Sequence, residues 1–175
     1  MSDLSVLGTL GFGLLLVRLV FGLAMAAHGA QKLFGWFGGY GLAGTGGFFE
    51  GLGFRPGKRF ALAAGLSEFG GGLLVALGLL GPVGPALIVS VMLVGMVTVH
   101  LKNPFFASSN GIELPLLYSA TAVALALTGP GVFSLDSILG LEFLWATQFA
   151  LIALGAGVLG GAANLVLLRK KPLAA

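Results

Sequence analysis

Apolar residues run along this chain in long blocks, separated by short segments that are polar or rich in glycine and proline. A helix needs about 20 mainly apolar residues to cross the hydrocarbon core of a bilayer. The blocks predict five membrane-spanning helices, over residues 5–30, 58–80, 84–101, 112–128 and 142–168. The sequence GPVGP at residues 81–85 combines a helix stop with a helix start, so the second and third helices are expected to form a tight hairpin.

The composition agrees with this pattern. The 175 residues are 57% hydrophobic and only 9% charged, whereas a soluble domain carries roughly 25% charged residues. We therefore predict an all-α, polytopic transmembrane helix bundle in contact with the lipid bilayer and with no role in nucleic-acid binding. The chain has no cysteine, so it has no thiol chemistry of its own, and any electrons must travel on a bound group.

Lys and Arg are unevenly divided between the predicted connections. One side of the membrane would carry eight of them: Lys32, Arg55, Lys58, Arg59, Lys102, Arg169, Lys170 and Lys171. The other side would carry none, and holds acidic residues such as Asp3 and Asp136. Cytoplasmic loops of membrane proteins carry the excess of positive charge, so we predict the N-terminus outside and the C-terminus in the cytoplasm.

The connection over residues 31–57 is rich in aromatic residues, which accumulate at membrane interfaces. Within it, residues 45–54 surround Glu50 with apolar side chains, which predicts a short interfacial or re-entrant segment that forms a lid over the cytoplasmic end of the bundle. Residues 39–44 match the pattern G-x-G-x-x-G. The dinucleotide fingerprint needs a preceding strand, whereas a membrane helix precedes this match, so we reject it.

Two charged residues interrupt the apolar blocks themselves. Arg18 lies in the first predicted helix and Glu68 in the second. A single charge in hydrocarbon costs at least about 2.5–3.5 kcal/mol. Counted from the cytoplasmic ends of the predicted helices, both residues lie ~13–15 Å deep, so we predict an intramembrane ion pair between them. Such a pair would either fix the helix register or couple to a proton or a ligand.

Further polar residues gather at the cytoplasmic ends of the predicted helices and form a candidate ligand-binding rim: His28, Gln31, Lys32, His100 and Glu113. Each also has a plain structural reading, as an interfacial hydrogen bonder or, for Glu113, as a carboxylate at a helix N-terminus. One alternative is haem, with His28 and His100 as the two axial ligands of the iron. Another is a metal ion such as zinc, held by both histidines and Glu113. A quinone is the third alternative, because histidine, an acid and aromatic rings suit protonation of a carbonyl oxygen. We favour the quinone over haem or a metal, and the sequence singles out no catalytic residue.

Small residues recur every four positions on two predicted helices. They are Gly22, Ala26 and Ala30 on the first helix, and Ala153, Gly157 and Gly161 on the fifth. This spacing allows two helix backbones to approach closely. Three consecutive glycines, residues 70–72, follow Glu68 and indicate a further close approach or a bound ligand.

Many of these residues stand in an order that resembles the DoxX family of small membrane proteins. The resemblance is carried by His28-Gly29-x-Gln31-Lys32-Leu33-Phe34-Gly35-Trp36-Phe37-Gly38-Gly39, Gly44-Thr45, Phe48-Phe49-Glu50-x-Leu52-Gly53, Gly65-x-x-Glu68-x-Gly70-Gly71, His100, Glu113-Leu114-Pro115-Leu116, and Gly129-Pro130-Gly131 with Ser134-Leu135-Asp136. It spans about residues 10–137. It implies a four-helix transmembrane domain at residues 1–140, with residues 31–57 as its interfacial loop. Residues 141–175 would then be an additional transmembrane helix with a basic cytoplasmic tail.

The resemblance also implies a redox-associated protein of the bacterial cytoplasmic (inner) membrane. The leading hypothesis is a quinone-linked subunit of a membrane oxidoreductase complex, in which Lys32 offers positive charge to the ligand. The alternative is a non-catalytic structural or assembly subunit, with other membrane-protein subunits or a second copy of the chain as partners. It would dock through the Gly-rich faces of the second and fifth predicted helices, with Gly157 and Gly161 on the fifth. A small transporter or channel is a third hypothesis, weakened by the lack of a visible inverted repeat.

Overall fold

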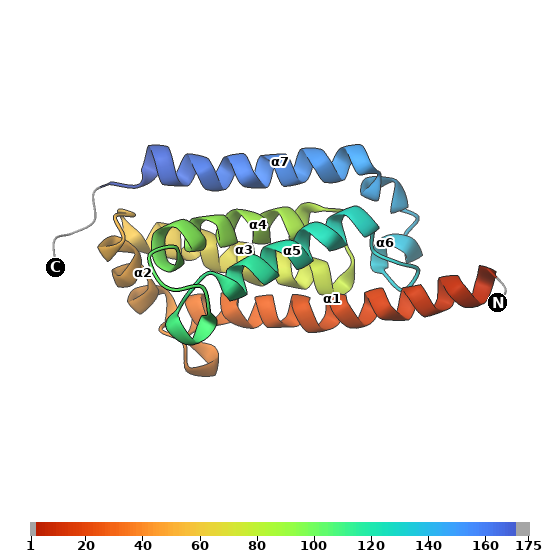
Figure 1. Ribbon diagram of the computed structural model, residues 1–175, viewed down its shortest axis with the longest axis horizontal. Coiled ribbons are helices and arrows are strands. Elements are labelled where there is room, and N and C mark those ends of the chain that lie inside the picture. The colour runs from red at the N-terminus through yellow and green to blue at the C-terminus, as the bar shows by residue number, and fades with distance from the viewer. Residues whose placement is uncertain (1–2, 171–175) are drawn as a thin grey trace.

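The computed structural model describes the backbone of residues 3–170, with side chains from residue 7 onward. Over this range the chain is a bundle of antiparallel helices without a β-strand, and the predicted all-α membrane bundle is confirmed. The long helices run along one axis, so that α1 begins at the end of the molecule opposite to the end of α7 (Figure 1). They are α1 (Asp3–Phe34), α3 (Gly57–Leu77), α4 (Val83–Gly95), α5 (Glu113–Thr128) and α7 (Thr147–Ala163).

Shorter helical elements join or extend these five helices. The connections contain η1 (Trp36–Gly38), α2 (Gly41–Gly51), η3 (Ala107–Ser109), α6 (Leu135–Ile138) and η4 (Glu142–Trp145). Two π-helical turns continue long helices, η2 (Met96–His100) after α4 and η5 (Asn164–Leu168) after α7. The predicted lid is therefore a helix, α2, which folds back against α3.

The helix boundaries differ from the expected ones in ways that matter for the site. Within residues 3–170, four helices are long and apolar enough to cross a membrane, whereas α5, with 16 residues, is a shorter apolar helix. Helix α7 begins at Thr147 rather than at residue 142, because Glu142–Trp145 forms a 3-10 turn and Ala146 is extended. Helix α1 does not end at residue 30 but continues to Phe34.

Glycines set the register between α1 and α3. A Cβ atom on Gly22 would lie 2.6 Å from the carbonyl oxygen of Gly72, and one on Gly29 would lie 2.7 Å from that of Gly65. Backbones this close leave no room for a side chain, which is the packing that small residues in membrane helices allow. Two such contacts along one helix pair fix which residues of α1 and α3 lie at the same level.

The small residues of α7 also pack inside the chain. A Cβ atom on Gly157 would lie 2.5 Å from the carbonyl oxygen of Ala86, and one on Gly161 would lie 2.9 Å from that of Ser90. Both partners are on α4. Gly157 and Gly161 are thus occupied by an intramolecular contact, and the expectation that they dock another subunit is wrong.

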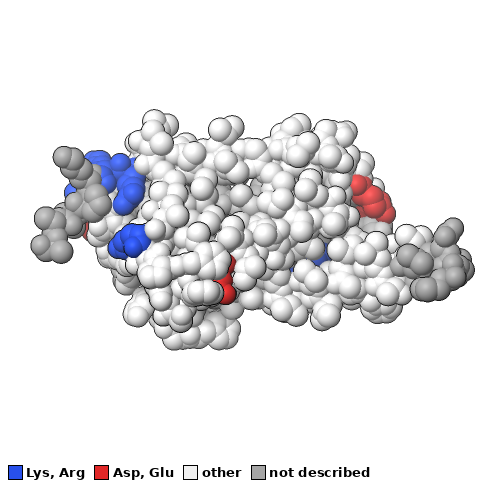
Figure 2. Space-filling model, viewed as in Figure 1, with Lys and Arg blue, Asp and Glu red and all other residues white. Residues whose placement is uncertain are grey.

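Charge is concentrated at one end of the bundle. Figure 2 shows Lys and Arg gathered there, while the broad middle of the visible face is almost free of charge. This end, called the basic end below, holds the C-terminal end of α1, the connection from α2 to α3, the loop after α4 and the end of α7. Lys171 and the side chain of Asp3, which entered the charge count, lie outside the described residues.

Candidate functional site

The predicted ion pair between Arg18 and Glu68 does not form. Arg18 is 2% exposed, and its guanidinium donates through Nη1 to the carbonyl oxygen of Pro130 and through Nη2, at 2.6 Å, to that of Phe133. Glu68 instead pairs with Lys32, whose Nζ lies 2.5 Å from Glu68 Oε2. The two buried charges therefore belong to separate clusters.

The reason for the error lies in the register of α1 and α3. Because α1 continues to Phe34, Arg18 lies 16 residues, or ~24 Å, from the basic end of its helix. The packing places Arg18 beside Gly78, since a Cβ atom there would lie 2.5 Å from Arg18 Nη1. Gly78 follows Glu68 by ten residues, which is ~15 Å along a helix. Arg18 and Glu68 lie too far apart along the bundle axis to meet.

Asp136, which the sequence analysis placed in an outer loop, is a further buried charge and lies near Arg18. Asp136 is 0% exposed, and its carboxylate accepts hydrogen bonds from the backbone N–H of Leu80, at 3.0 Å, and of Gly81, at 2.7 Å, and from Trp145 Nε1, at 2.7 Å. Leu80 and Gly81 both have φ near +60°, and consecutive N–H groups in such a turn form a nest for an anion. Asp136 thus ties the connection between α3 and α4 to the segment before α7, at the end of the bundle opposite the basic end. The signal that could have found it was its place in the family resemblance.

The predicted rim residues lead to a cavity of about 390 Å³ near the basic end. Helices α1, α3, α4 and α5, the turn η5 after α7, and the lid helix α2 with its C-terminal loop contribute to the wall. The wall is mainly apolar and aromatic, with Phe48, Phe49, Phe54 and Phe60 on the side of the lid and of the start of α3. Its polar side chains come from every long helix or its π-turn extension: His28, Lys32, Ser67, Glu68, Ser90, Thr98, His100, Tyr118 and Asn164.

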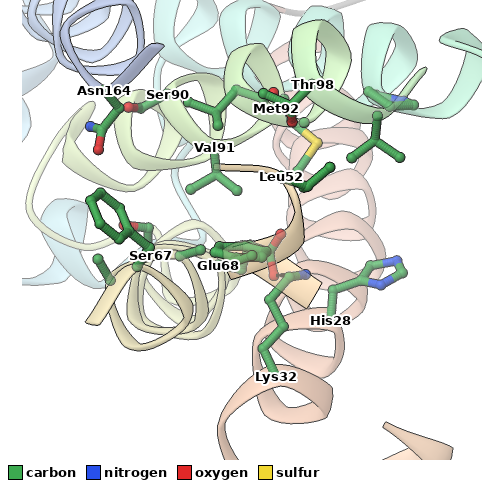
Figure 3. Close-up of a pocket in the computed structure, with 18 of the residues that line it drawn as sticks. His28, Lys32, Leu52, Ser67, Glu68, Ser90, Val91, Met92, Thr98 and Asn164 are labelled. Carbon is green, nitrogen blue, oxygen red and sulfur yellow. Dashed lines mark hydrogen bonds and ion pairs between the residues drawn. The ribbon is translucent and has the colours of Figure 1, made fainter. Parts of the chain in front are cut away.

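The Lys32–Glu68 pair is the charged centre of this cavity. Both residues line it, and Figure 3 shows Lys32 of α1 reaching toward Glu68 of α3. The Glu68 side chain is 3% exposed and the Lys32 side chain 26%. A carboxylate this buried is costly without a partner, and the ammonium group at 2.5 Å supplies one.

Two histidines line the same cavity. His28 makes a ring contact with Tyr118, with centroids 5.9 Å apart. His100 Nδ1 lies 2.9 Å from the carbonyl oxygen of Asn110, so Nδ1 carries the proton and donates it. In the neutral ring this leaves Nε2 of His100 as an acceptor. The cavity therefore combines an ammonium group, a carboxylate and two imidazoles.

The two π-helical turns both lie at the cavity. Turn η2 supplies Thr98 and His100, and turn η5 supplies Asn164. A π-turn adds a residue to one helical turn, and such turns occur frequently at functional sites. Without the added residue, the following side chains would be rotated around the helix, so these turns set which polar groups face the cavity.

Gln31 and Glu113 do not line this cavity. Gln31 Nε2 donates to the carbonyl oxygen of Phe37 at 3.2 Å, and Gln31 lines a neighbouring hollow, whose wall shares Lys32, Phe48 and Phe49 with the cavity. Glu113 Oε2 accepts a hydrogen bond from the backbone N–H of Ala107 at 2.7 Å. Of the five predicted rim residues, the structure brings His28, Lys32 and His100 together and adds Glu68 and Tyr118.

Comparison with known proteins identifies the family of this chain. The sequence model of the DoxX family matches residues 13–101, about half of the chain. The chain belongs to the DoxX family. The matched segment contains the charged centre of the cavity, Lys32 and Glu68, and both histidines, His28 and His100.

A relative from Bacillus subtilis (strain 168) carries the name "Putative oxidoreductase CatD". It is 32% identical to this DoxX protein over 124 residues, which are 71% of this chain and 84% of the relative. No solved structure matches the chain.

The cavity of this DoxX protein has the size and the wall of a small-molecule pocket. Ligand pockets usually have volumes of about 300–1,000 Å³, with apolar walls and a few placed polar groups, and this cavity matches both features. Within the described residues, no three His, Asp or Glu side chains are grouped so that they could hold a metal ion. The zinc set considered from the sequence is not assembled, because Glu113 lies with Ala107 outside the cavity wall.

Proposed function

We propose that this DoxX protein binds a quinone head group in the cavity, as a redox-associated subunit of a membrane oxidoreductase complex. The observation that carries the proposal is the Lys32–Glu68 pair, placed with His28 and His100 in a cavity whose remaining wall is largely aromatic and apolar. The name of the Bacillus subtilis relative agrees with a redox role.

Each group has a distinct part in this proposal. Lys32 donates a hydrogen bond to a quinone carbonyl oxygen and stabilises negative charge there. Glu68 holds Lys32 in place and accepts or returns a proton, while a histidine at the opposite oxygen does the same. The aromatic side chains exclude water from the ring. The chain has no cysteine, so a partner subunit supplies the two electrons that reduction of a quinone to a quinol requires.

The proposal includes an orientation. Seven of the nine Lys and Arg residues lie at the basic end within the described residues: Lys32, Arg55, Lys58, Arg59, Lys102, Arg169 and Lys170. The excess of positive charge favours the cytoplasmic side of a bacterial inner membrane. The cavity then lies in the cytoplasmic half of the bilayer, with the N-terminus outside and the C-terminus inside.

The test uses the purified protein in lipid nanodiscs and a short-chain quinone, with binding measured by calorimetry. We expect His28→Phe, which keeps an aromatic ring against Tyr118 but removes both nitrogens, to weaken binding about tenfold. Gln31→Ala is the matched control, since Gln31 belongs to the same predicted rim but lies outside the cavity. Equal affinity of His28→Phe and wild type would contradict the proposal, as would a loss of the same size in Gln31→Ala.

The alternative of a purely structural subunit has lost one of its two predicted docking faces. The face on the fifth predicted helix carried Gly157 and Gly161, and both glycines pack against α4 of the same chain. If the wild-type protein binds no quinone, the structural role regains the lead, with a docking surface elsewhere on the bundle.

A further inference from the structure

The cavity reaches the outer surface of the bundle between α3 and α7. On the α3 side its wall consists of Ala63, Ala64 and Ser67, and on the α7 side of Asn164. Ala63 is exposed and at the same time lines the cavity, so it lies at an opening. Figure 3 shows Ser67 and Asn164 on one side of the space and His28 on the far side. We call the gap bordered by Ala63, Ala64, Ser67 and Asn164 the lateral opening.

Aromatic contacts close the wall between α1 and α5. Tyr118 of α5 lies against two rings of α1, with centroids 6.1 Å from Phe21 and 5.9 Å from His28. Large rings therefore fill this side, where the lateral opening has alanine and serine.

The basic end is closed by the loop after α2. Phe54 is 2% exposed, with its ring 5.2 Å from Phe60. The C-terminal segment fastens this loop, because Arg169 Nε donates to the carbonyl oxygen of Leu52 at 2.9 Å and the Lys170 N–H donates to that of Gly53 at 2.9 Å. The basic end is thus capped by a fastened loop, and bulky side chains narrow the cavity there and between α1 and α5.

The lateral opening lies at the depth of the lipid chains. Helix α3 has 21 residues, which span ~31 Å and match the ~30 Å hydrocarbon core. Ala63 follows Gly57, the first residue of α3, by six residues and Ser67 by ten, so they lie ~9 Å and ~15 Å into the core. An opening at this depth faces acyl chains and not water.

We propose that the ligand of this site is a membrane-borne quinone with a long isoprenoid tail, which enters from the bilayer through the lateral opening and leaves its tail there. This inference rests on the proposed function and adds the substrate class and the route of entry. The head group lies beside Lys32, Glu68 and His28, and the tail passes over Ala63 and Ala64 into the lipid. The small side chains of α3 leave room for the methyl-branched chain, and Asn164 stands at the border between head and tail.

The first experiment compares two ligands in nanodiscs: a long-tail quinone incorporated with the lipid, and a tail-less quinone added from solution. Ala63→Trp places a large ring in the lateral opening, and we expect it to reduce retention of the long-tail quinone about tenfold, with at most a twofold effect on the tail-less one. Ala156→Trp is the matched control, because Ala156 is exposed on α7 and does not line the cavity. It should leave both affinities unchanged.

The second experiment needs no variant and so does not depend on how Ala63→Trp folds. A long-tail quinone with a photoreactive diazirine on its first isoprene unit is activated in the wild-type protein, and the labelled peptides are identified by mass spectrometry. We expect labels on residues 57–67 of α3 and on η5. Labels on α1 and α5 would overturn the lateral route, as would equal effects of Ala63→Trp on both quinones.

Failure of the inference differs from failure of the proposed function. If the wild-type protein binds neither quinone, both proposals are wrong. If it binds the tail-less quinone but copurifies with a phospholipid acyl chain in the lateral opening and no long-tail quinone, the head-group site stands and the inference about the tail is wrong.

Discussion

Loss of Lys32 should destabilise this protein far more than loss of Glu68, although the two residues form one ion pair. The Glu68 side chain is 3% exposed, so Lys32→Met leaves a carboxylate buried without a partner. Breaking a buried pair in this way costs about 3–5 kcal/mol. We expect about 3 kcal/mol, the lower limit of that range, because the Lys32 side chain is 26% exposed and the pair is therefore not fully desolvated.

The opposite substitution leaves a different charge behind. In Glu68→Gln the ammonium group of Lys32 is on a long, flexible side chain that extends toward the basic end and water. We expect this variant to lose about 1 kcal/mol, the size of one hydrogen bond. The double variant buries no unpaired charge, so it should lose about 2 kcal/mol, less than Lys32→Met alone, with a coupling of about 2 kcal/mol between the two sites.

The free energies of unfolding come from denaturant titrations of the purified variants in detergent micelles, followed by circular dichroism. Lys102→Met is the control, because Lys102 is an exposed lysine at the same end of the bundle, and its loss should change the free energy of unfolding by less than about 0.5 kcal/mol. Equal losses of stability for Lys32→Met and Glu68→Gln would refute the reasoning that Glu68 is more deeply buried than Lys32. Strictly additive losses in the double variant would refute the coupling between them.

Three further predictions test other parts of the structure. Gly29→Ala should lose about 1–3 kcal/mol of stability, because its Cβ atom would lie 2.3 Å from a backbone nitrogen of α3, whereas Gly13→Ala has nothing within 4 Å and should be neutral or stabilising in the same unfolding assay. Asp136→Asn removes one carboxylate oxygen from three donors and should shift the fluorescence emission of Trp145, which donates to it; an unchanged spectrum and unchanged stability would contradict the cluster. Arg169→Ala should speed amide hydrogen exchange in the loop after α2, since it removes a side-chain hydrogen bond to that loop; equal exchange in the variant and wild type would show that the C-terminal segment does not fasten it.

The pattern of apolar residues was enough to predict the class of fold and the approximate position of each helix. A membrane helix satisfies its own backbone hydrogen bonds, so a sufficiently long apolar block is helical whatever its neighbours are. The glycines and prolines at residues 81–85 act locally as well, so they located the turn between α3 and α4. The order of unusual residues from His28 to Asp136 was also enough to predict the family, since the resemblance is a property of the sequence alone.

The partners of the buried charges were decided by tertiary structure. Depth estimated from predicted helix ends placed Arg18 opposite Glu68, whereas the extension of α1 to Phe34 together with the stagger between α1 and α3 separates them. The level at which two helices meet depends on close backbone contacts such as the one between Gly29 and α3, and a single sequence does not state which glycine faces which helix. The sequence therefore determined which residues carry charge into the membrane, while the packing of the helices determined which charges meet and where the cavity opens.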